Sequence, residues 1–295
     1  MGSQSRESFL TIKTFGGLSI RLDDGKDKIV LSDLASALLV TLASERRAVP
    51  KSRLLEILAP AQPSREAACR LARCIDEISG SLPKYLDVDR QHISLNPLKP
   101  LLFDRNEIDF QVSQVQEHLQ LDGQLSRSLT FSLERVLTWY AGPFLSGFYL
   151  ESAPRFNEWV SLERTRLELL AHDGYEILAS LFADLGETER SIFFTQQVIS
   201  LQPRTETAYQ RLMQLLINVG RRSEALSVYQ TCVEILGSQF GRQPHDKTQA
   251  LYEAIRDDQP LPNKSSRFYF PPLVSSQSTA PPISLFNSSS TGEAV

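Results

Sequence analysis

The sequence has few of the residues on which covalent cross-links, metal sites and catalysis usually depend. It contains only three cysteines and four scattered histidines in 295 residues. This is too little for a disulfide framework, and no Cys/His spacing is typical of a metal site. Phosphate loops and the GxSxG and HExxH motifs are also missing. We therefore predict a protein that is not an enzyme and that needs neither a cofactor nor a metal ion.

Long apolar runs are lacking as well. No stretch approaches the roughly 18–20 apolar residues that cross a bilayer, and no basic-then-apolar segment resembles a secretion signal. The paucity of cysteines fits a reducing compartment. We expect a cytoplasmic protein that does not associate with membranes.

A strong excess of positive charge is missing too, since the formal net charge is −4. The charge is nevertheless uneven along the chain. Residues 1–100 contain 15 Lys and Arg against 12 Asp and Glu, a formal charge of +3, which leaves −7 for residues 101–295. Any attraction to the phosphates of a nucleic acid is therefore expected in the first hundred residues.

The order of elements predicted for residues 1–100 is that of a winged helix-turn-helix preceded by a small sheet. Residues 8–31 alternate and are interrupted by glycine turns, which predicts two or three short antiparallel strands. Three helices are expected next, one capped by Ser32, one starting at Pro50, and one from Ser64 to about Ser79 that stops at Gly80. Residues 85–95 then alternate as a β-hairpin.

The second part of the chain is predicted to be a helical-repeat array. Gly186 and Gly220 lie 34 residues apart, and the same offset pairs Tyr175 with Tyr209. This is the tetratricopeptide period, in which pairs of antiparallel helices stack into a solenoid. We therefore predict a mainly α fold with a small β part, divided into a winged helix (1–100), helical repeats (101–258) and a disordered Pro/Ser-rich tail (259–295).

Several segments resemble bacterial regulators of the antibiotic-regulatory-protein (SARP) type, in which a bacterial transcriptional activator domain follows a winged helix. The likeness is close in WYAGPFLSGF at 139–148, FNEW at 156–159 and YQTCVEIL at 229–236. PKSRLL at 50–55, residues 65–78 and LDVDRQHISLN at 86–96 line up with the family's second helix, recognition helix and wing. The resemblance implies a transcriptional regulator that binds double-stranded DNA.

The third predicted helix is the candidate for contact with the major groove, with Ala67, Leu71, Ile75 and Ile78 facing inward and Arg73 outward. Cations of the second helix and the wing are the candidates for phosphate contacts. The residues expected to bind DNA are Lys51, Arg53, Arg65, Arg70, Arg73, Lys84 and Arg90. The repeats are expected to contact RNA polymerase, another regulator or a second copy of the chain.

Two carboxylates leave a second interpretation open. The SARP-type family usually has Leu-Arg or Arg-Arg where this chain has Asp76-Glu77, and acidic groups facing the groove would repel phosphate. Helical spacing also allows ion pairs of Glu66 with Arg70 and of Arg73 with Asp76 or Glu77. The chain is therefore predicted to be either a DNA-binding regulator or a protein-interaction scaffold whose winged helix has lost DNA reading.

Overall fold

The computed structural model describes residues 9–22, 27–59, 64–122 and 125–260, which fall into two compact units. One contains the described residues up to Gln111 together with Thr138–Leu167, and the other contains Val112–Leu137 and the described residues from Glu168 onward. Helices predominate and the strands are few and short, which confirms the predicted fold class. The predicted domain boundaries stay a prediction, and almost all of the predicted tail lies outside the described residues.

A four-stranded sheet opens the first unit. Strands β1 (Leu10–Lys13), β2 (Ser19–Leu22) and β3 (Asp27–Ile29) are antiparallel, as predicted. Alternation places Leu10 and Ile12 in the core, where both are fully buried. Strand β7 (Leu101–Phe103) pairs in parallel with β1, and this pairing was not predicted because a three-residue strand has too little alternation to detect.

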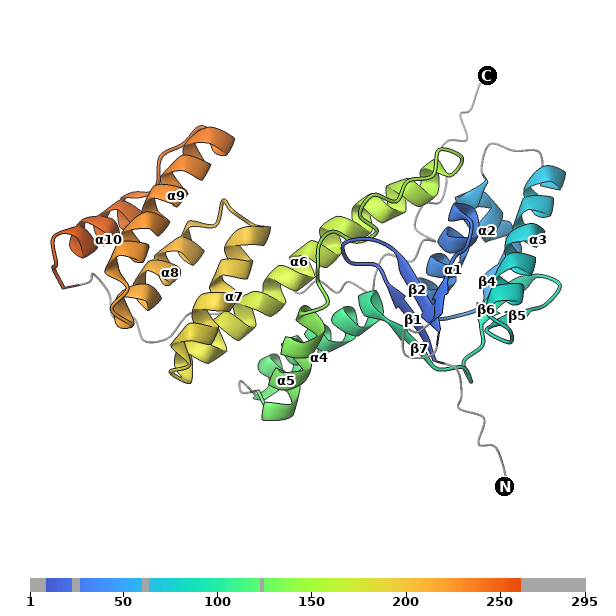
Figure 1. Cartoon of the computed structure of the whole chain (residues 1–295), viewed down its shortest axis with the longest axis horizontal. Helices are drawn as coiled ribbons and strands as arrows, with labels where there is room; N and C mark the ends of the chain where they lie inside the picture. Colours follow the sequence, from blue (N-terminus) through green and yellow to red (C-terminus); the bar gives the residue numbers. More distant parts are fainter. Residues whose placement is uncertain (1–8, 23–26, 60–63, 123–124, 261–295) are drawn as a thin grey trace, which may run out of the picture. The chain divides into compact units, whose positions relative to one another are not determined.

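The winged helix follows in the predicted order (Figure 1). Helix α1 (Asp33–Glu45) is capped by Ser32, whose side chain accepts from the backbone N–H of Ala35. Strand β4 (Val49–Pro50), α2 (Lys51–Leu58) and α3 (Ser64–Ser81) come next, and β5 (Leu86–Val88) and β6 (His92–Leu95) form the wing. These three strands make a sheet of order β4-β6-β5.

Three consecutive polar residues at the start of α4 (Asp104–Asp122) tie together other elements of the first unit. Asp104 accepts hydrogen bonds from the backbone N–H and hydroxyl of Thr14, which follows β1, at 2.6 and 2.7 Å. Arg105 donates to Glu163 of α6 (Pro154–Asp184), and Asn106 donates to the carbonyl of Ala43 in α1 at 2.9 Å. The sheet, α6 and the winged helix are therefore joined by buried hydrogen bonds.

Glu163 is the centre of a buried charge network. Its side chain is completely buried and forms ion pairs with Arg105 at 2.5 Å and Arg166 at 2.8 Å. Arg166 also pairs with Asp109 at 2.8 Å. Desolvation opposes the charged form, but the two guanidinium groups outweigh it and lower the pKa of the Glu163 carboxyl.

Aromatic side chains from the segment 139–159 form part of the core of the first unit. Phe144, Phe156 and Trp159 are buried, and the rings of Phe144 and Trp159 meet edge to face with centroids 5.8 Å apart. Phe15 joins them, with its ring 6.4 Å from that of Phe144.

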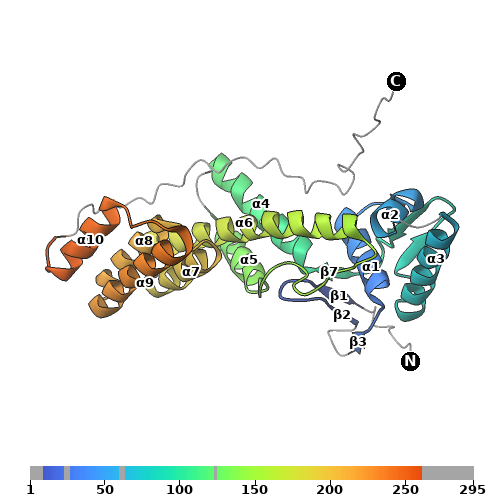
Figure 2. The same ribbon diagram turned by 90° about the horizontal axis from the view of Figure 1, so that it is seen from above.

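The second unit contains the predicted helical repeat. Besides parts of α4 and α6, it comprises α5 (Arg127–Leu137), α7 (Thr188–Leu201), α8 (Glu206–Asn218), α9 (Arg222–Phe240) and α10 (Asp246–Arg256), and Figure 2 shows α7 to α10 side by side. Gly186 and Gly220 end equivalent helices in the left-handed region, with φ of 74° and 79°. The turn after each glycine is closed by the same backbone hydrogen bond, to Phe182 and Leu216. The 34-residue period is confirmed.

Two kinds of feature are absent from the residues that the structure describes. None of their helices is both long enough and apolar enough to cross a membrane. Nor do they contain a group of three or more His, Cys, Asp or Glu side chains placed to hold a metal ion.

Candidate nucleic-acid interface

Helix α3 presents one apolar face to the protein and one polar face to solvent. Its buried residues are Ala67, Leu71, Cys74 and Ile78, which recur at the spacing of a single helical face. Cys74 occupies the inward position that was predicted for Ile75, which is only half-buried. The prediction was wrong because a cysteine behaves as a small apolar residue, and burial raises the pKa of this thiol to about 11.

Arg73 and Asp76 are exposed, as the helical spacing predicts, and so are Glu66 and Cys69. Arg65, whose position lies at the edge of this face, is exposed as well. The helix continues to Ser81, so the prediction that it stops at Gly80 was wrong. An uninterrupted helical face is thus available to a partner.

Glu77 is a paired carboxylate, and its partner is Ser32. It accepts hydrogen bonds from the backbone N–H of Ser32 at 2.5 Å and from the Ser32 hydroxyl at 2.7 Å. Ser32 is the N-cap of α1, so the negative charge lies where the dipole of α1 favours it. The predicted ion pair between Arg73 and Glu77 is therefore wrong.

We expect Glu77→Ala to lower the free energy of unfolding by about 1–2 kcal/mol, because it removes two hydrogen bonds and a favourable charge at the start of α1. The neighbouring change Asp76→Ala is the matched control and should stay within about 0.5 kcal/mol, since Asp76 is exposed. Urea unfolding followed by circular dichroism measures both. Equal effects of the two substitutions would contradict the capping role.

The remaining charges on α3 are paired to different degrees. Arg70 forms the predicted ion pair with Glu66, at 3.4 Å. Arg73 and Asp76 form no ion pair with each other or with any other described residue, so the predicted pair between them is wrong. Exposed pairs contribute only about 0.2–0.5 kcal/mol, so Arg70 exchanges Glu66 for another anion at small cost.

Lys51 lies beside the tip of the wing. Its ammonium donates to the carbonyl of Asp89, and its backbone N–H donates to the carbonyl of Gln91, both at 2.7 Å. The Asp89 carboxylate closes the turn by accepting from the backbone N–H groups of His92 and Gln91, which hold the pKa of Asp89 below its usual value. Arg90 is exposed in this turn, so the structure brings Lys51 and Arg90 together at the wing.

Arg53 and Lys84 lie in different surroundings. The Arg53 side chain is only 16% exposed and pairs with Glu56 at 3.0 Å, within a hollow that Glu45 and Arg47 also line. Lys84 is exposed between α3 and β5 and has a left-handed backbone with φ of 68°. Arg53 is therefore less accessible to a partner than Lys84 is.

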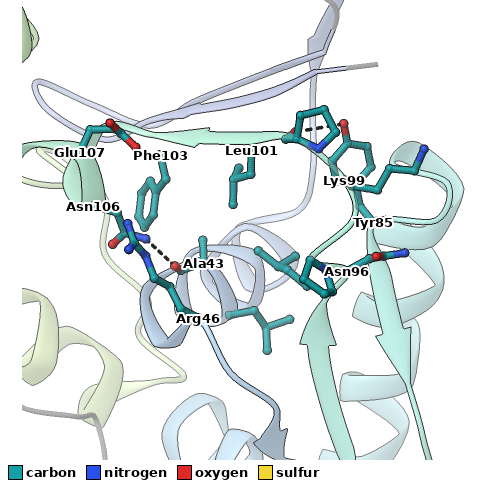
Figure 3. A pocket seen from close by; sticks show the side chains of 13 residues that line it. Ala43, Arg46, Tyr85, Asn96, Lys99, Leu101, Phe103, Asn106 and Glu107 are labelled. Atoms are coloured by element: carbon teal, nitrogen blue, oxygen red, sulfur yellow. Dashed lines mark hydrogen bonds between the residues drawn. The ribbon is translucent and has the colours of Figure 1, made fainter. Parts of the chain in front are cut away.

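A cavity of about 430 Å³ lies elsewhere in the first unit, lined by α1, the wing and the segment that leads into α4 (Figure 3). Leu42, Tyr85, Leu101 and Phe103 supply much of its apolar lining, and the hydrogen bond between Asn106 and Ala43 crosses one side. None of the seven residues predicted to bind DNA lines it. The cavity is thus separate from the candidate interface.

Sequence reasoning missed the roles of Glu77 and of Asp104 to Asn106. The N-cap at Ser32 was recognisable from the sequence. Glu77, which accepts hydrogen bonds from Ser32, is 45 residues away in the chain and was not. The available signal for the buried hydrogen bonds of Asp104 to Asn106 was that three polar residues directly follow the apolar triplet Leu101–Phe103. Polar residues that are buried need hydrogen-bond partners.

Comparison with known proteins agrees with this architecture. Residues 104–256 match the family model described as bacterial transcriptional activator domain. Among solved structures, Mycobacterium tuberculosis EmbR, in complex with a low-affinity phosphopeptide, is similar in fold with a TM-score of 0.59. It is 18% identical, and the match covers 87% of this chain and 67% of that one. No curated protein matches the sequence.

Proposed function

Since the chain belongs to the bacterial transcriptional activator domain family and is a regulator of the SARP type, we propose that it binds double-stranded DNA, with α3 in the major groove. The observation that carries the proposal is the exposed face of α3, on which Arg73 has no partner among the described residues. A guanidinium group in this position suits guanine O6 and N7.

Lys51, Arg90 and Lys84 are proposed to contact phosphates on either side of α3, and Arg65 and Arg70 to do so from the helix itself. Such contacts fix the register of a protein on DNA without reading sequence. Arg53 is assigned a lesser part because Glu56 already neutralises it and most of its side chain is covered.

The helical repeats are proposed to contact RNA polymerase, another regulator or a second copy of the chain. This proposal rests on large apolar side chains that the second unit exposes, since such side chains favour protein contacts. They include Leu121, Phe131, Leu185 and Phe193, each more than 50% exposed. In this proposal the protein acts in the cytoplasm through binding rather than catalysis.

The test of DNA binding is capture of fragments from a random DNA pool by the full-length chain, followed by fluorescence anisotropy at 50 and 200 mM salt. With the five proposed phosphate contacts, affinity is expected to fall roughly 500-fold between the two salt concentrations. At either salt concentration the double variant Arg70→Ala, Arg73→Ala should bind DNA at least about tenfold more weakly than the unchanged chain, because a good base contact contributes about 1–3 kcal/mol.

Arg127→Ala is the matched control, because Arg127 is an exposed arginine on α5 in the second unit. It should leave affinity unchanged. If the full-length chain retains no DNA even at 50 mM salt, the protein-interaction scaffold becomes the better account of the fold. Exposed Asp76 and Glu66 on α3 are the observations that favour that alternative.

A further inference from the structure

Three of the four nearest neighbours of Asp76 on its face of α3 have small side chains. Its neighbours one turn away on the same face are Ala72, Arg73, Ser79 and Gly80, all of them exposed. Except for Arg73, none of these side chains extends beyond the short aspartate. A flat partner can therefore approach the helix closely enough for the Asp76 carboxylate to reach it.

Gly80 strengthens this point because the fold itself does not require a glycine there. It lies within α3, outside the left-handed region, and a Cβ atom would meet nothing within 4 Å. Glycine is the poorest helix former after proline. The missing side chain is thus unexplained by packing or by backbone conformation, and it leaves open space beside Asp76.

The charges at Asp76 and Arg73 are both available to a partner. Neither has a hydrogen bond or ion pair among the described residues. Glu77, the adjacent acid, is engaged by Ser32, so Asp76 and Glu66 are the exposed carboxylates of this helix. Glu66 is occupied by Arg70.

An ionised carboxylate only accepts hydrogen bonds. In the major groove the donors are the exocyclic amino groups, N4 of cytosine and N6 of adenine, whereas arginine pairs with guanine. Three residues of helix rise about 4.5 Å, which is close to the 3.4 Å between successive bases. Arg73 and Asp76 therefore have the spacing to address neighbouring base pairs.

We propose that Asp76 is a base-reading residue that accepts a hydrogen bond from a cytosine N4 amino group beside a guanine bound by Arg73. The inference rests on the proposed DNA binding and assigns the specificity within it. The carboxylate lowers overall affinity because it repels phosphate. It adds specificity because it disfavours bases that lack an amino group at the major-groove edge.

The test selects DNA from a random pool with the full-length chain and with the variants Asp76→Ala, Asp76→Asn and Glu66→Gln. The unchanged chain should enrich a site with guanine next to cytosine. Asp76→Ala should lose the preference at the cytosine, by about 5- to 150-fold for the best against the worst base. Asp76→Asn should shift that position towards adenine, which pairs with an amide.

Glu66→Gln is the control for charge alone. It also removes one exposed carboxylate from α3, and it should raise affinity for all sequences without changing the enriched site. If the unchanged chain retains no DNA, the proposed function fails. If it retains DNA but enriches no sequence, or enriches a site that Asp76→Ala leaves unaltered, the DNA-binding function stands and the role of Asp76 is overturned.

A second variant, Gly80→Ala, tests the close approach independently. Alanine favours the helix, so Tm should rise slightly. Affinity for the enriched site should nevertheless fall by about fivefold or more, because a methyl group in a close-packed contact costs about that much. A gain in Tm with unchanged affinity would overturn the close approach of α3.

Discussion

Glu163→Ala is expected to destabilise the folded protein by about 3–5 kcal/mol, because it removes one partner of a buried ion pair and leaves a buried charge uncompensated. The group left behind is the Arg105 guanidinium, whose side chain is only 5% exposed. Arg105 keeps Asn106 as a hydrogen-bond acceptor at 2.7 Å. Asp109 lies farther from it, at 3.8 Å. Neither contact replaces the two hydrogen bonds that Glu163 accepts from Arg105.

Guanidinium chloride unfolding of the full-length protein measures this loss. Glu158→Ala is the matched control, because Glu158 is an exposed glutamate five residues earlier in α6. It should change the free energy of unfolding by no more than about 0.5 kcal/mol. Similar values for the two variants would show that the buried network contributes little to stability.

The pH dependence of stability gives a separate prediction from the same carboxyl. Its pKa in the folded protein is below the usual value of 4.5. The unfolded chain therefore binds the proton first as pH falls, so the contribution of Glu163 is complete above about pH 4.5 and is lost below it. Glu163→Gln has no proton to bind at this position, so its stability deficit relative to the unchanged protein should shrink as pH falls below about 4.5.

The comparison with Glu163→Gln also isolates Glu163 from Asp104, which titrates in the opposite sense. Burial raises the pKa of Asp104 in spite of the hydrogen bonds from Thr14 and Phe15. Its protonation therefore favours the folded state as pH falls. Both proteins contain Asp104, so its effect cancels in their difference. A deficit that stays constant from pH 7 to pH 3 would contradict the lowered pKa of Glu163.

The sequence predicted those features that depend on residues close together in the chain. The outward positions of Arg73 and Asp76 follow from helical spacing, and Ser32 is a recognisable N-cap. The 34-residue period follows from the glycines that end successive helices. Each of these is decided by local backbone geometry, which one sequence is enough to reveal.

The features that were missed depend on partners far apart in the chain. Glu77 lies four residues after Arg73, a spacing that allows an ion pair, but tertiary packing places Glu77 beside Ser32 instead. Asp104 contacts Thr14, 90 residues away. Ile75 and Cys74 are adjacent, and only the angle at which α3 packs decides which of them is buried. Helical periodicity does not specify that angle.

Glu206→Ala is expected to have the second-largest effect, a local loss of about 2–4 kcal/mol that is confined to α10. The Glu206 carboxylate is nearly buried and accepts from the backbone N–H of His245 and the hydroxyl of Thr248, both at 2.8 Å. It also pairs with Arg242 at 3.0 Å. His245 is the N-cap of α10. The Glu206 carboxylate therefore anchors the start of this helix, where a negative charge interacts favourably with the helix dipole.

The loss is expected to be local because α10 is the last of the described helices and packs on one side only. Leu251 and Ile255 enter the core formed with α7, α8 and α9, and the ring of Tyr252 stacks on that of Tyr229, while the other side of the helix is exposed. Hydrogen exchange followed by mass spectrometry should therefore show faster exchange in residues 246–256 and little change in α8. Glu234→Ala, at an exposed position of α9, should leave both unchanged. Faster exchange throughout the second unit would instead mean that Glu206 supports the whole repeat array, because the repeats then unfold as one cooperative unit rather than from the end.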